Sequence, residues 1–336
     1  MKKFLGVLVL FLCGGVFSAY GQPGKISGYM FGDYYYMAAS HKSNLKGQNG
    51  FRLRRIYFTY DKELGSRFDT RLRLEMNSAG HFTGKSKLVP SVKDAYLRWK
   101  KNGQQIILGI SSTPTWDVIE KVWGYRSVEK TALDLQKIGS SRGFGLAVKG
   151  NLLADGTVKY HLMLANGTGT QPEANKEKKI LGSIGFYPNR SIIIELYGDF
   201  ERQPGSHDVY TLQAFAAYKT NRGRIGVQFA HQTRRAAGSP KLEVASIFGA
   251  VRLSGKVNFF ARIDKMFEPN PNGAAIAYIP FDPGARSLFA VTGLDFIPAG
   301  NIHFMPNVEL VSYEANASGQ KPGRDLIPRV TFYYKF

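Results

Sequence analysis

Strict alternation of apolar and polar residues runs through most of this chain, and it restricts the possible folds more than any other feature. In the clearest stretch, 68–77, one set of alternate residues reads Phe, Thr, Leu, Leu, Met and the other reads Asp, Arg, Arg, Glu, Asn. Because successive side chains of a β-strand point to opposite faces, the pattern predicts a strand with one apolar and one polar face. About 16 such segments follow one another, each near the roughly 9–11 residues that a tilted membrane-spanning strand needs.

The connections between these segments alternate between short turns and long loops. The short ones carry Gly or Asn, as at 64–66, 101–103 and 221–223, which suits tight hairpin turns. The last stretch, 329–336, alternates again and ends on an aromatic residue, which is typical of bacterial outer-membrane proteins. The pattern predicts an all-β, transmembrane antiparallel β-barrel of about 16 strands, with 14 or 18 left open, in the outer membrane. The expected long loops are 39–50, 78–91, 111–141, 166–179, 201–207, 232–241, 267–286 and 312–324.

The N-terminus resembles a secretory signal. Lys2 and Lys3 precede a short apolar run, and Ala19 and Gly21 are small residues at the −3 and −1 positions. We therefore expect a signal peptide at 1–21 and a single outer-membrane barrel domain at 22–336, with an N-terminal membrane anchor as the alternative. Cys13, the single cysteine, lies inside this signal, so the mature chain has no thiol for a disulfide or thiolate chemistry.

Several segments, in order, resemble the phosphate-selective porin O and P family of bacterial outer-membrane porins. They are Phe-Arg-Leu-Arg-Arg at 51–55, Asp-Ala-Tyr-Leu at 94–97, Gly109 followed by Thr-Pro at 113–114 and Arg-Ser-Val-Glu-Lys at 126–130, Ala-Arg-Ile-Asp at 261–264, and Gly-Leu-Asp-Phe at 293–296 followed by Pro-Asn at 306–307. The resemblance implies a trimeric, 16-stranded barrel with a long third loop that folds into the lumen. The family's phosphate-specific members line the pore with an arginine ladder and a lysine cluster, which this sequence carries in part.

The polar faces hold the candidate pore residues. A cation near the membrane midplane costs about 2–4 kcal/mol in lipid, so these faces should point into the lumen. Pairing with acids on neighbouring strands is the alternative role, above all for Arg71 and Arg73. Arg52 and Arg54 near the external end could instead bind lipopolysaccharide phosphates. The expected pore-lining, anion-interacting residues are Arg55, Arg71, Arg73, Arg98 and Arg262.

Two of the long loops call for separate expectations. In the third loop, 111–141, Asp117, Glu120, Arg126 and Lys130 are the candidate constriction residues, with projection towards a trimer neighbour as the alternative. The proline-rich loop 267–286 is interpreted as a flexible external loop without a function.

Other function classes have little support in this sequence. The histidines lack metal-ligand spacing, which predicts no metal site and no cofactor. No hydrolase, phosphate-loop or zinc-protease motif is present, although an enzyme or adhesin that uses the barrel as a scaffold is the alternative function. The net charge of +20 comes from basic residues spread at strand periodicity, so nucleic-acid binding is not expected.

The sequence therefore predicts a non-enzymatic porin for small hydrophilic solutes, with a mild preference for anions and phosphate as a candidate. The expected partners are these solutes, outer-membrane lipid with lipopolysaccharide, and two further copies of the chain in a homotrimer. The anion preference is mild because inward bases exceed inward acids by one. The bases are Arg55, Arg71, Arg73, Arg98, Lys159, Arg224, Arg262 and Arg329, and the acids are Asp69, Glu75, Asp94, Glu195, Asp199, Asp264 and Glu309.

Overall fold

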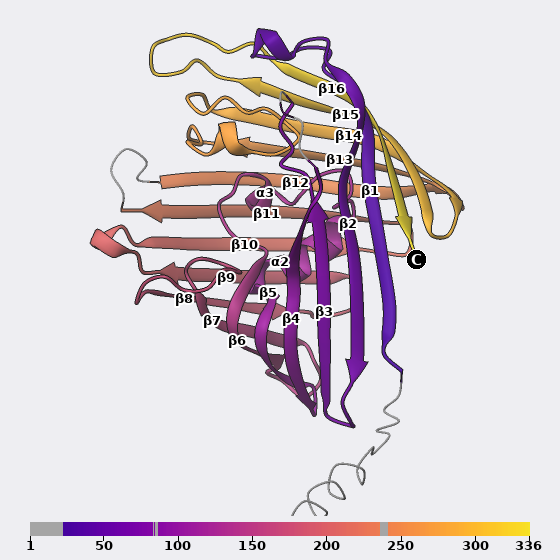
Figure 1. Ribbon diagram of the computed structural model, residues 1–336, viewed down its shortest axis with the longest axis vertical. Helices are drawn as coiled ribbons and strands as arrows, with labels where there is room; N and C mark the ends of the chain where they lie inside the picture. The colour runs from indigo at the N-terminus through magenta and orange to yellow at the C-terminus, as the bar shows by residue number, and fades with distance from the viewer. Residues whose placement is uncertain (1–22, 83, 85–86, 236–240) are drawn as a thin grey trace, which may run out of the picture.

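The chain forms a closed barrel of 16 antiparallel strands, as the alternation predicts (Figure 1). This computed structural model describes residues 23–82, 84, 87–235 and 241–336. The expected signal peptide, 1–21, lies outside the described residues and stays a prediction. Each strand pairs with its neighbours in the sequence, and pairing of the first strand with the last closes the ring.

The strands are 9 to 15 residues long, which is enough to cross a bilayer at a tilt. They are β1 (Lys25–Tyr36), β2 (Asn49–Glu63), β3 (Phe68–Asn77), β4 (Val89–Lys101), β5 (Gln104–Ser112), β6 (Arg142–Asn151), β7 (Val158–Asn166), β8 (Lys178–Phe186), β9 (Ile192–Glu201), β10 (Val209–Lys219), β11 (Gly223–Arg234), β12 (Lys241–Ser254), β13 (Val257–Met266), β14 (Ser287–Ala299), β15 (Ile302–Tyr313) and β16 (Asp325–Lys335).

The two ends of the barrel differ in their connections. At one end, which we call the short-turn end, the links are 64–67, 102–103, 152–157, 187–191, 220–222, 255–256 and 300–301. The opposite, long-loop end carries, among others, 37–48, 113–141, 167–177, 202–208, 267–286 and 314–324.

The outer wall of the barrel is apolar, and the inner wall is mostly polar. Leu72, Leu164 and Phe304 are exposed on the outside, whereas Asp69 and Glu75 are buried on the inside. A continuous apolar outer wall is stable against lipid but not against water, so the strands form a membrane-spanning wall. None of the described helices has the length and apolar character to cross a membrane.

Two long connections turn inward and fill part of the lumen. The third loop, 113–141, contains the helices α2 and α3, which Figure 1 shows inside the ring of strands. The β13–β14 loop, 267–286, also packs inside, because Ile276, Tyr278, Ile279 and Phe281 are buried there. The interpretation of 267–286 as a flexible external loop is therefore wrong, since its apolar residues join the barrel's interior cluster. The short helices are α2 (Pro114–Trp123), α3 (Ala132–Leu135), η1 (Ser43–Leu45), η2 (Pro204–Ser206) and η3 (Gly273–Ala275).

Candidate pore constriction

The helix α2 sets the path of the third loop across the lumen. Pro114 starts the helix, where its missing N–H costs no hydrogen bond, and Gly124 ends it in the left-handed conformation with φ of 70°. Ile119 and Trp123 lie four residues apart on the face that packs against the wall. The Trp123 ring meets the ring of Phe248 edge to face at 5.5 Å. This apolar face holds the helix inside the barrel and leaves its polar face towards the water.

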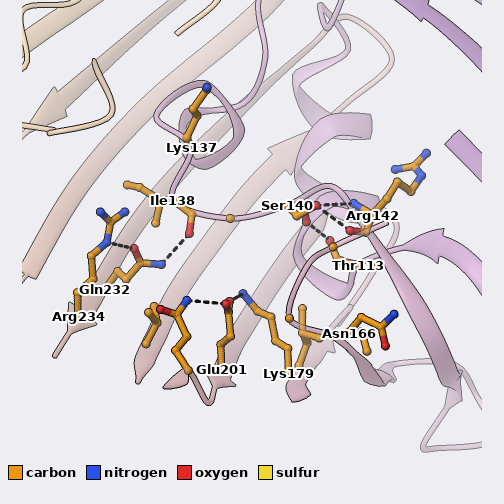
Figure 2. A pocket seen from close by; sticks show the side chains of 18 of the residues that line it. Thr113, Lys137, Ile138, Ser140, Arg142, Asn166, Lys179, Glu201, Gln232 and Arg234 are labelled. Carbon is orange, nitrogen blue, oxygen red and sulfur yellow. Dashed lines mark hydrogen bonds and ion pairs between the residues drawn. The ribbon is translucent and has the colours of Figure 1, made fainter. Parts of the chain in front are cut away.

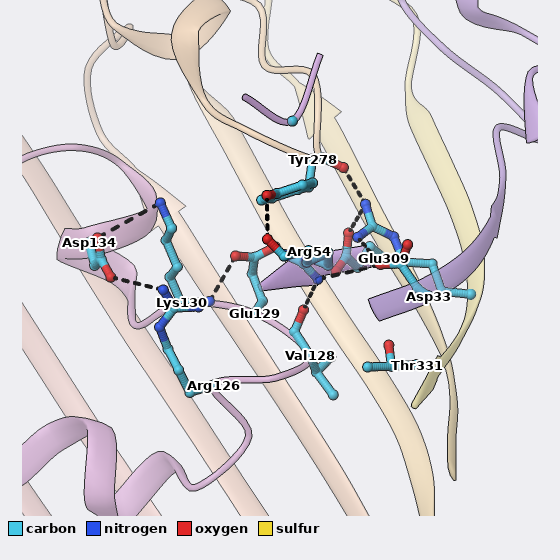
Figure 3. A network of polar contacts seen from close by, with 12 residues as sticks. Asp33, Arg54, Arg126, Val128, Glu129, Lys130, Asp134, Tyr278, Glu309 and Thr331 are labelled. Carbon is cyan, nitrogen blue, oxygen red and sulfur yellow. Dashed lines mark hydrogen bonds and ion pairs between the residues drawn. The ribbon is translucent and has the colours of Figure 1, made fainter. Parts of the chain in front are cut away.

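A buried ionic network attaches the next part of the third loop to the wall (Figure 3). Arg54 of β2 donates to the Val128 carbonyl at 2.6 Å and to the Glu129 carboxylate at 3.0 Å. Its guanidinium also lies 3.6 Å from Asp33 of β1. The Arg54 side chain is 1% exposed and that of Glu129 is fully buried. Arg54 therefore cannot reach lipopolysaccharide phosphates, which corrects the alternative that the sequence left open.

A second arginine extends this network and joins it to the β13–β14 loop. Arg329 of β16 pairs with Asp33 at 3.1 Å and with Glu309 at 2.9 Å, and it donates to the Tyr278 carbonyl. The Tyr278 hydroxyl in turn donates to the Arg54 carbonyl at 3.0 Å. A loop that moved away would leave a buried charge without its partner, which costs free energy. We therefore expect the network to hold both loops in place.

A β-bulge explains why Arg54 and Arg55 both face inward. The β1–β2 register shifts between Phe31 and Gly32, because Phe31 pairs with Arg55 and Gly32 pairs with Leu53. The extra residue, Arg54, lets two successive side chains lie on one face. A second bulge in β4 does the same for Lys93 and Asp94.

The wall opposite α2 carries cations that share carboxylates. Asp94 pairs with Arg73 at 3.3 Å and with Arg142 at 2.5 Å. Glu75 likewise pairs with Arg55 and, at 3.0 Å, with Lys93. Two cations on one carboxylate leave a positive excess at each position.

The third loop contributes a smaller set of charges that faces this wall. Arg126 lies 3.4 Å from Glu120 and 3.7 Å from Asp134, and Lys130 lies 3.8 Å from Asp134. The pKa of Lys130 is lowered to about 8, mainly by burial; the Asp134 carboxylate opposes this lowering and the guanidinium of Arg126 adds to it. Burial would raise the pKa of Asp134, but Lys130 and Arg126 outweigh it and hold that pKa at about 2.

The charges of the wall and of the third loop together form one cluster, which we call the candidate constriction. Arg55 and Lys93 of the wall lie within electrostatic reach of Asp134, and Arg142 lies within reach of Glu120. The constriction therefore holds six cations and four carboxylates. The cations are Arg55, Arg73, Lys93, Arg126, Lys130 and Arg142, and the carboxylates are Glu75, Asp94, Glu120 and Asp134.

Five of the nine expected site residues meet at the constriction. They are Arg55, Arg73, Glu120, Arg126 and Lys130. The other four make their ion pairs outside the constriction, although Asp117 also interacts with Arg142 and Arg71 also interacts with Asp94. Arg71 pairs with Asp61 at 2.7 Å, Arg98 pairs with Asp69 at 2.9 Å, Asp117 pairs with Lys149 at 2.9 Å, and Arg262 pairs with Asp264 at 2.5 Å.

Arg262 has a different environment from the other expected pore arginines. Its side chain is 1% exposed, and its guanidinium also donates to the Lys130 carbonyl. Arg262 therefore holds the third loop against β13. It is not among the residues that we propose below to contact anions.

Sequence reasoning missed Lys93 and Arg142. Lys93 was missed because strict alternation gives it to the lipid face. Arg142 is the first residue of β6 and directly follows the expected loop 111–141. Adjacent charges in the middle of a spanning strand, such as Lys93 and Asp94, were the available signal for the bulge.

Open cavities lie on both sides of the third loop. On the long-loop side, a cavity of about 460 Å³ lies between residues 137–140 and the strands β6–β11. Figure 2 shows Lys179 and Glu201 adjacent on its wall, 3.2 Å apart, with Gln232 bonded to the Ile138 carbonyl at 2.6 Å. On the short-turn side, a cavity of about 390 Å³ borders Glu120 and Arg126. The charged constriction thus lies between two spaces that water can fill.

Neither a protein-family model nor a curated protein matches this sequence. Solved structures do resemble the fold. The anion-selective porin from Comamonas acidovorans has a TM-score of 0.68 at 11% identity, covering 93% of this chain and 99% of that one. OmpF of Salmonella typhi, in complex with daunomycin, has a TM-score of 0.66 at 10% identity, covering 93% and 97%. The outer-membrane channel DcaP of Acinetobacter baumannii has a TM-score of 0.64 at 12% identity, covering 93% and 97%. The likeness shows that the chain has the porin fold.

Proposed function

We propose that the chain is a porin of the bacterial outer membrane, through which small hydrophilic solutes diffuse passively. A barrel of 16 strands is wide enough to leave an aqueous lumen, whereas eight strands would be filled by side chains. The apolar outer wall, the polar inner wall and the cavities on both sides of the third loop all support a channel. The short-turn end would face the periplasm and the long-loop end the exterior. The proposed channel carries no catalytic step and needs no cofactor.

A mild preference for anions follows from the constriction, and one observation carries it. The carboxylates of Asp94 and Glu75 each bind two cations, so the narrow part of the channel has more positive than negative charge. Charge at the narrow part governs selectivity, because fields from distant loop tips are screened over about 8 Å at physiological salt.

Phosphate is one anion that the channel would admit. The ordered motifs that resemble the phosphate-selective O and P family support this proposal. The guanidiniums of Arg55, Arg73 and Arg142 are each engaged by a carboxylate. We therefore propose passage of phosphate with other small anions, and not a tight phosphate site.

We also propose that the porin is a homotrimer embedded in outer-membrane lipid and lipopolysaccharide. Closed oligomers of identical chains are the commonest assemblies of such proteins, and the family resemblance points to three copies. Native mass measurement in mild detergent tests this, and a stable monomer would contradict it.

Reconstitution of the full chain in a planar bilayer tests the proposed function. We expect discrete conductance steps. In a KCl gradient, we expect a reversal potential whose sign shows that Cl⁻ is mildly more permeant than K⁺. Deletion of residues 117–130, which removes most of α2 together with Glu120, Arg126 and Lys130, should raise the single-channel conductance. A protein that inserts but shows no conductance steps would refute the porin proposal, and unchanged conductance after the deletion would refute the constriction.

A further inference from the structure

The cavity on the short-turn side of the third loop combines two kinds of surface. It has a volume of about 390 Å³, within the range of about 300–1,000 Å³ that is usual for small-molecule sites. Tyr29 and Tyr333 contribute aromatic rings on one side, and Arg224, Asp295 and His303 contribute polar groups. This mixture can contact a solute that has both an apolar and a charged part.

The aromatic side is a continuous group of rings from β1, β2 and β16. Tyr29 stacks on Tyr57 at 4.5 Å with an angle of 30° between the rings, and it lies 5.8 Å from the ring of Tyr333. His303 of β15 meets Tyr333 edge to face at 5.3 Å. Tyr29 and Tyr333 are half-buried, so part of each ring borders the cavity. These rings can pack against a flat apolar or aromatic solute.

The polar side chains that border the cavity have partners of opposite or complementary kind, and Arg224 differs from them. Arg126 has Glu120 at 3.4 Å, and His303 has Asp295 at 2.8 Å. Arg224 of β11 has no carboxylate within ion-pair distance among the residues that the structure describes. It is therefore the cation of this cavity that has no ion-pair partner, and Tyr125, whose hydroxyl donates to Asp295 at 3.3 Å, lies between the two groups.

The third loop holds the Arg224 guanidinium in place. Its Nη2 donates to the Trp123 carbonyl at 3.0 Å, and its centre lies 5.3 Å from the ring of Tyr125. One side of the planar group is thus fixed by the loop, and its Nε is buried without a hydrogen-bond partner, so the Nη groups are the donors available to a ligand. A guanidinium suits a carboxylate because its donors match the two carboxylate oxygens.

We propose that this cavity binds small aromatic carboxylates, with the carboxylate on Arg224 and the ring against Tyr29 and Tyr333. The proposal deepens the porin function, on which it rests, by naming a class of solute that pauses next to the constriction. A single guanidinium with an aromatic wall favours a flat organic monoanion over phosphate, which needs more donors around it.

The test uses the full chain in a planar bilayer, with benzoate as the probe and acetate and benzyl alcohol as comparisons. Benzoate should interrupt the KCl current at concentrations where acetate, which lacks the ring, and benzyl alcohol, which lacks the charge, do not. The cavity lies on the short-turn side of the third loop. Benzoate added on that side should therefore block at lower concentration than benzoate added on the long-loop side. Equal action of acetate would overturn the aromatic part of the proposal.

Matched variants locate the site. Arg224→Gln should raise the blocking concentration of benzoate about tenfold, as loss of a charged hydrogen bond predicts, whereas Arg222→Gln, in the exposed turn nearby, should leave it unchanged. Tyr333→Leu should weaken the block, and Tyr334→Leu on the lipid face should not. Equal block in Arg224→Gln and Arg222→Gln would overturn the proposal.

Further measurements separate a failure of this site from a failure of folding or of the channel. Arg224→Lys keeps the charge but loses the planar fork, so its block should be intermediate if the site is built as proposed. Calorimetric titration of benzoate into the detergent-solubilised protein measures binding without any need for conductance. A conducting channel that benzoate neither blocks nor binds would refute this inference and leave the proposed porin function standing.

Discussion

Replacement of Arg73 by Gln removes one positive charge from the constriction while leaving its carboxylate satisfied. Arg73 lies 3.3 Å from Asp94, and Asp94 keeps Arg142 at 2.5 Å after the change. We therefore expect the variant to fold. Arg71→Gln is the matched variant, because it removes the same charge two residues along β3, where Arg71 pairs with Asp61 at 2.7 Å.

The expected size of the effect follows from screened electrostatics. A unit charge about 6 Å from a passing ion, in water at 0.1 M salt, contributes about 0.4 kcal/mol. The contribution has opposite signs for Cl⁻ and K⁺, so its loss lowers the ratio of Cl⁻ to K⁺ permeability by about threefold. Residues two positions apart along a strand are about 7 Å apart. The Arg71 charge is therefore about 9 Å from an ion at the narrow point, compared with about 6 Å for the Arg73 charge. At about 9 Å the same reasoning gives a change of about twofold.

The reversal potential in a KCl gradient measures this ratio directly. The order of shifts towards cations should be Arg73→Gln, then Arg71→Gln, with no shift for Arg190→Gln, whose side chain is exposed in a short turn. At 1 M salt the two shifts should shrink, because the screening length falls to about 3 Å. A shift for Arg71→Gln that equals or exceeds that for Arg73→Gln would refute the placement of the constriction at Asp94.

Three further perturbations test the loops and the charges that hold them. Arg54→Met should lower the free energy of unfolding by about 3–5 kcal/mol, because it leaves Glu129 buried without its cation. Urea denaturation measures this free energy, with Arg190→Met as the control. Equal stability of the two variants would contradict the prediction. Anion preference should fall between pH 7 and 9, because Lys130, with a pKa of about 8, loses its positive charge as the pH rises. The reversal potential should therefore show a step in this pH range, which Lys130→Met should remove. A step that persists in Lys130→Met would belong to another group. Replacement of 274–282 by a glycine-serine linker should raise single-channel conductance, because this segment packs inside the barrel, and unchanged conductance would place it outside the ion path.

Much of the barrel could be predicted because membrane strands obey a simple rule. Every residue in the wall faces lipid or lumen, so the alternation at 68–77 specifies both the strand and its faces, as the structure confirms. The tight turns are short and carry Gly or Asn, which makes the boundaries of strands readable. The strand number of 16 followed from the regular alternation of short and long connections.

The interior of the barrel could not be predicted in the same way, because no periodicity governs it. The contact between Arg54 and Glu129 joins residues 75 positions apart, and Tyr278 meets Arg54 across 224 positions. Neither pair has a local signal. The β13–β14 loop was misinterpreted because its prolines suggested irregular backbone, although its apolar residues, such as Ile279 and Phe281, are what brings it into the interior.

The two bulges show how the sequence does mark the constriction. Strict alternation would place Arg54 on the lipid face of β2 and Lys93 on the lipid face of β4, where a cation deep in the membrane costs about 2–4 kcal/mol. Each of these residues stands directly before another charged residue, Arg55 or Asp94, and the bulge turns both members of the pair inward. Adjacent charges in the middle of a spanning strand therefore indicate a bulge, because the alternative exposes a charge to lipid; near strand ends, as at Asp264 and Lys265, the register stays continuous. The bulges in β2 and β4 both border the third loop, whereas two further register shifts lie at the short-turn end, between Arg252 and Ser254 and between Phe296 and Ala299. The β2 and β4 bulges provide Arg54, which binds that loop, and Lys93, which adds a cation to the constriction that strict alternation could not supply.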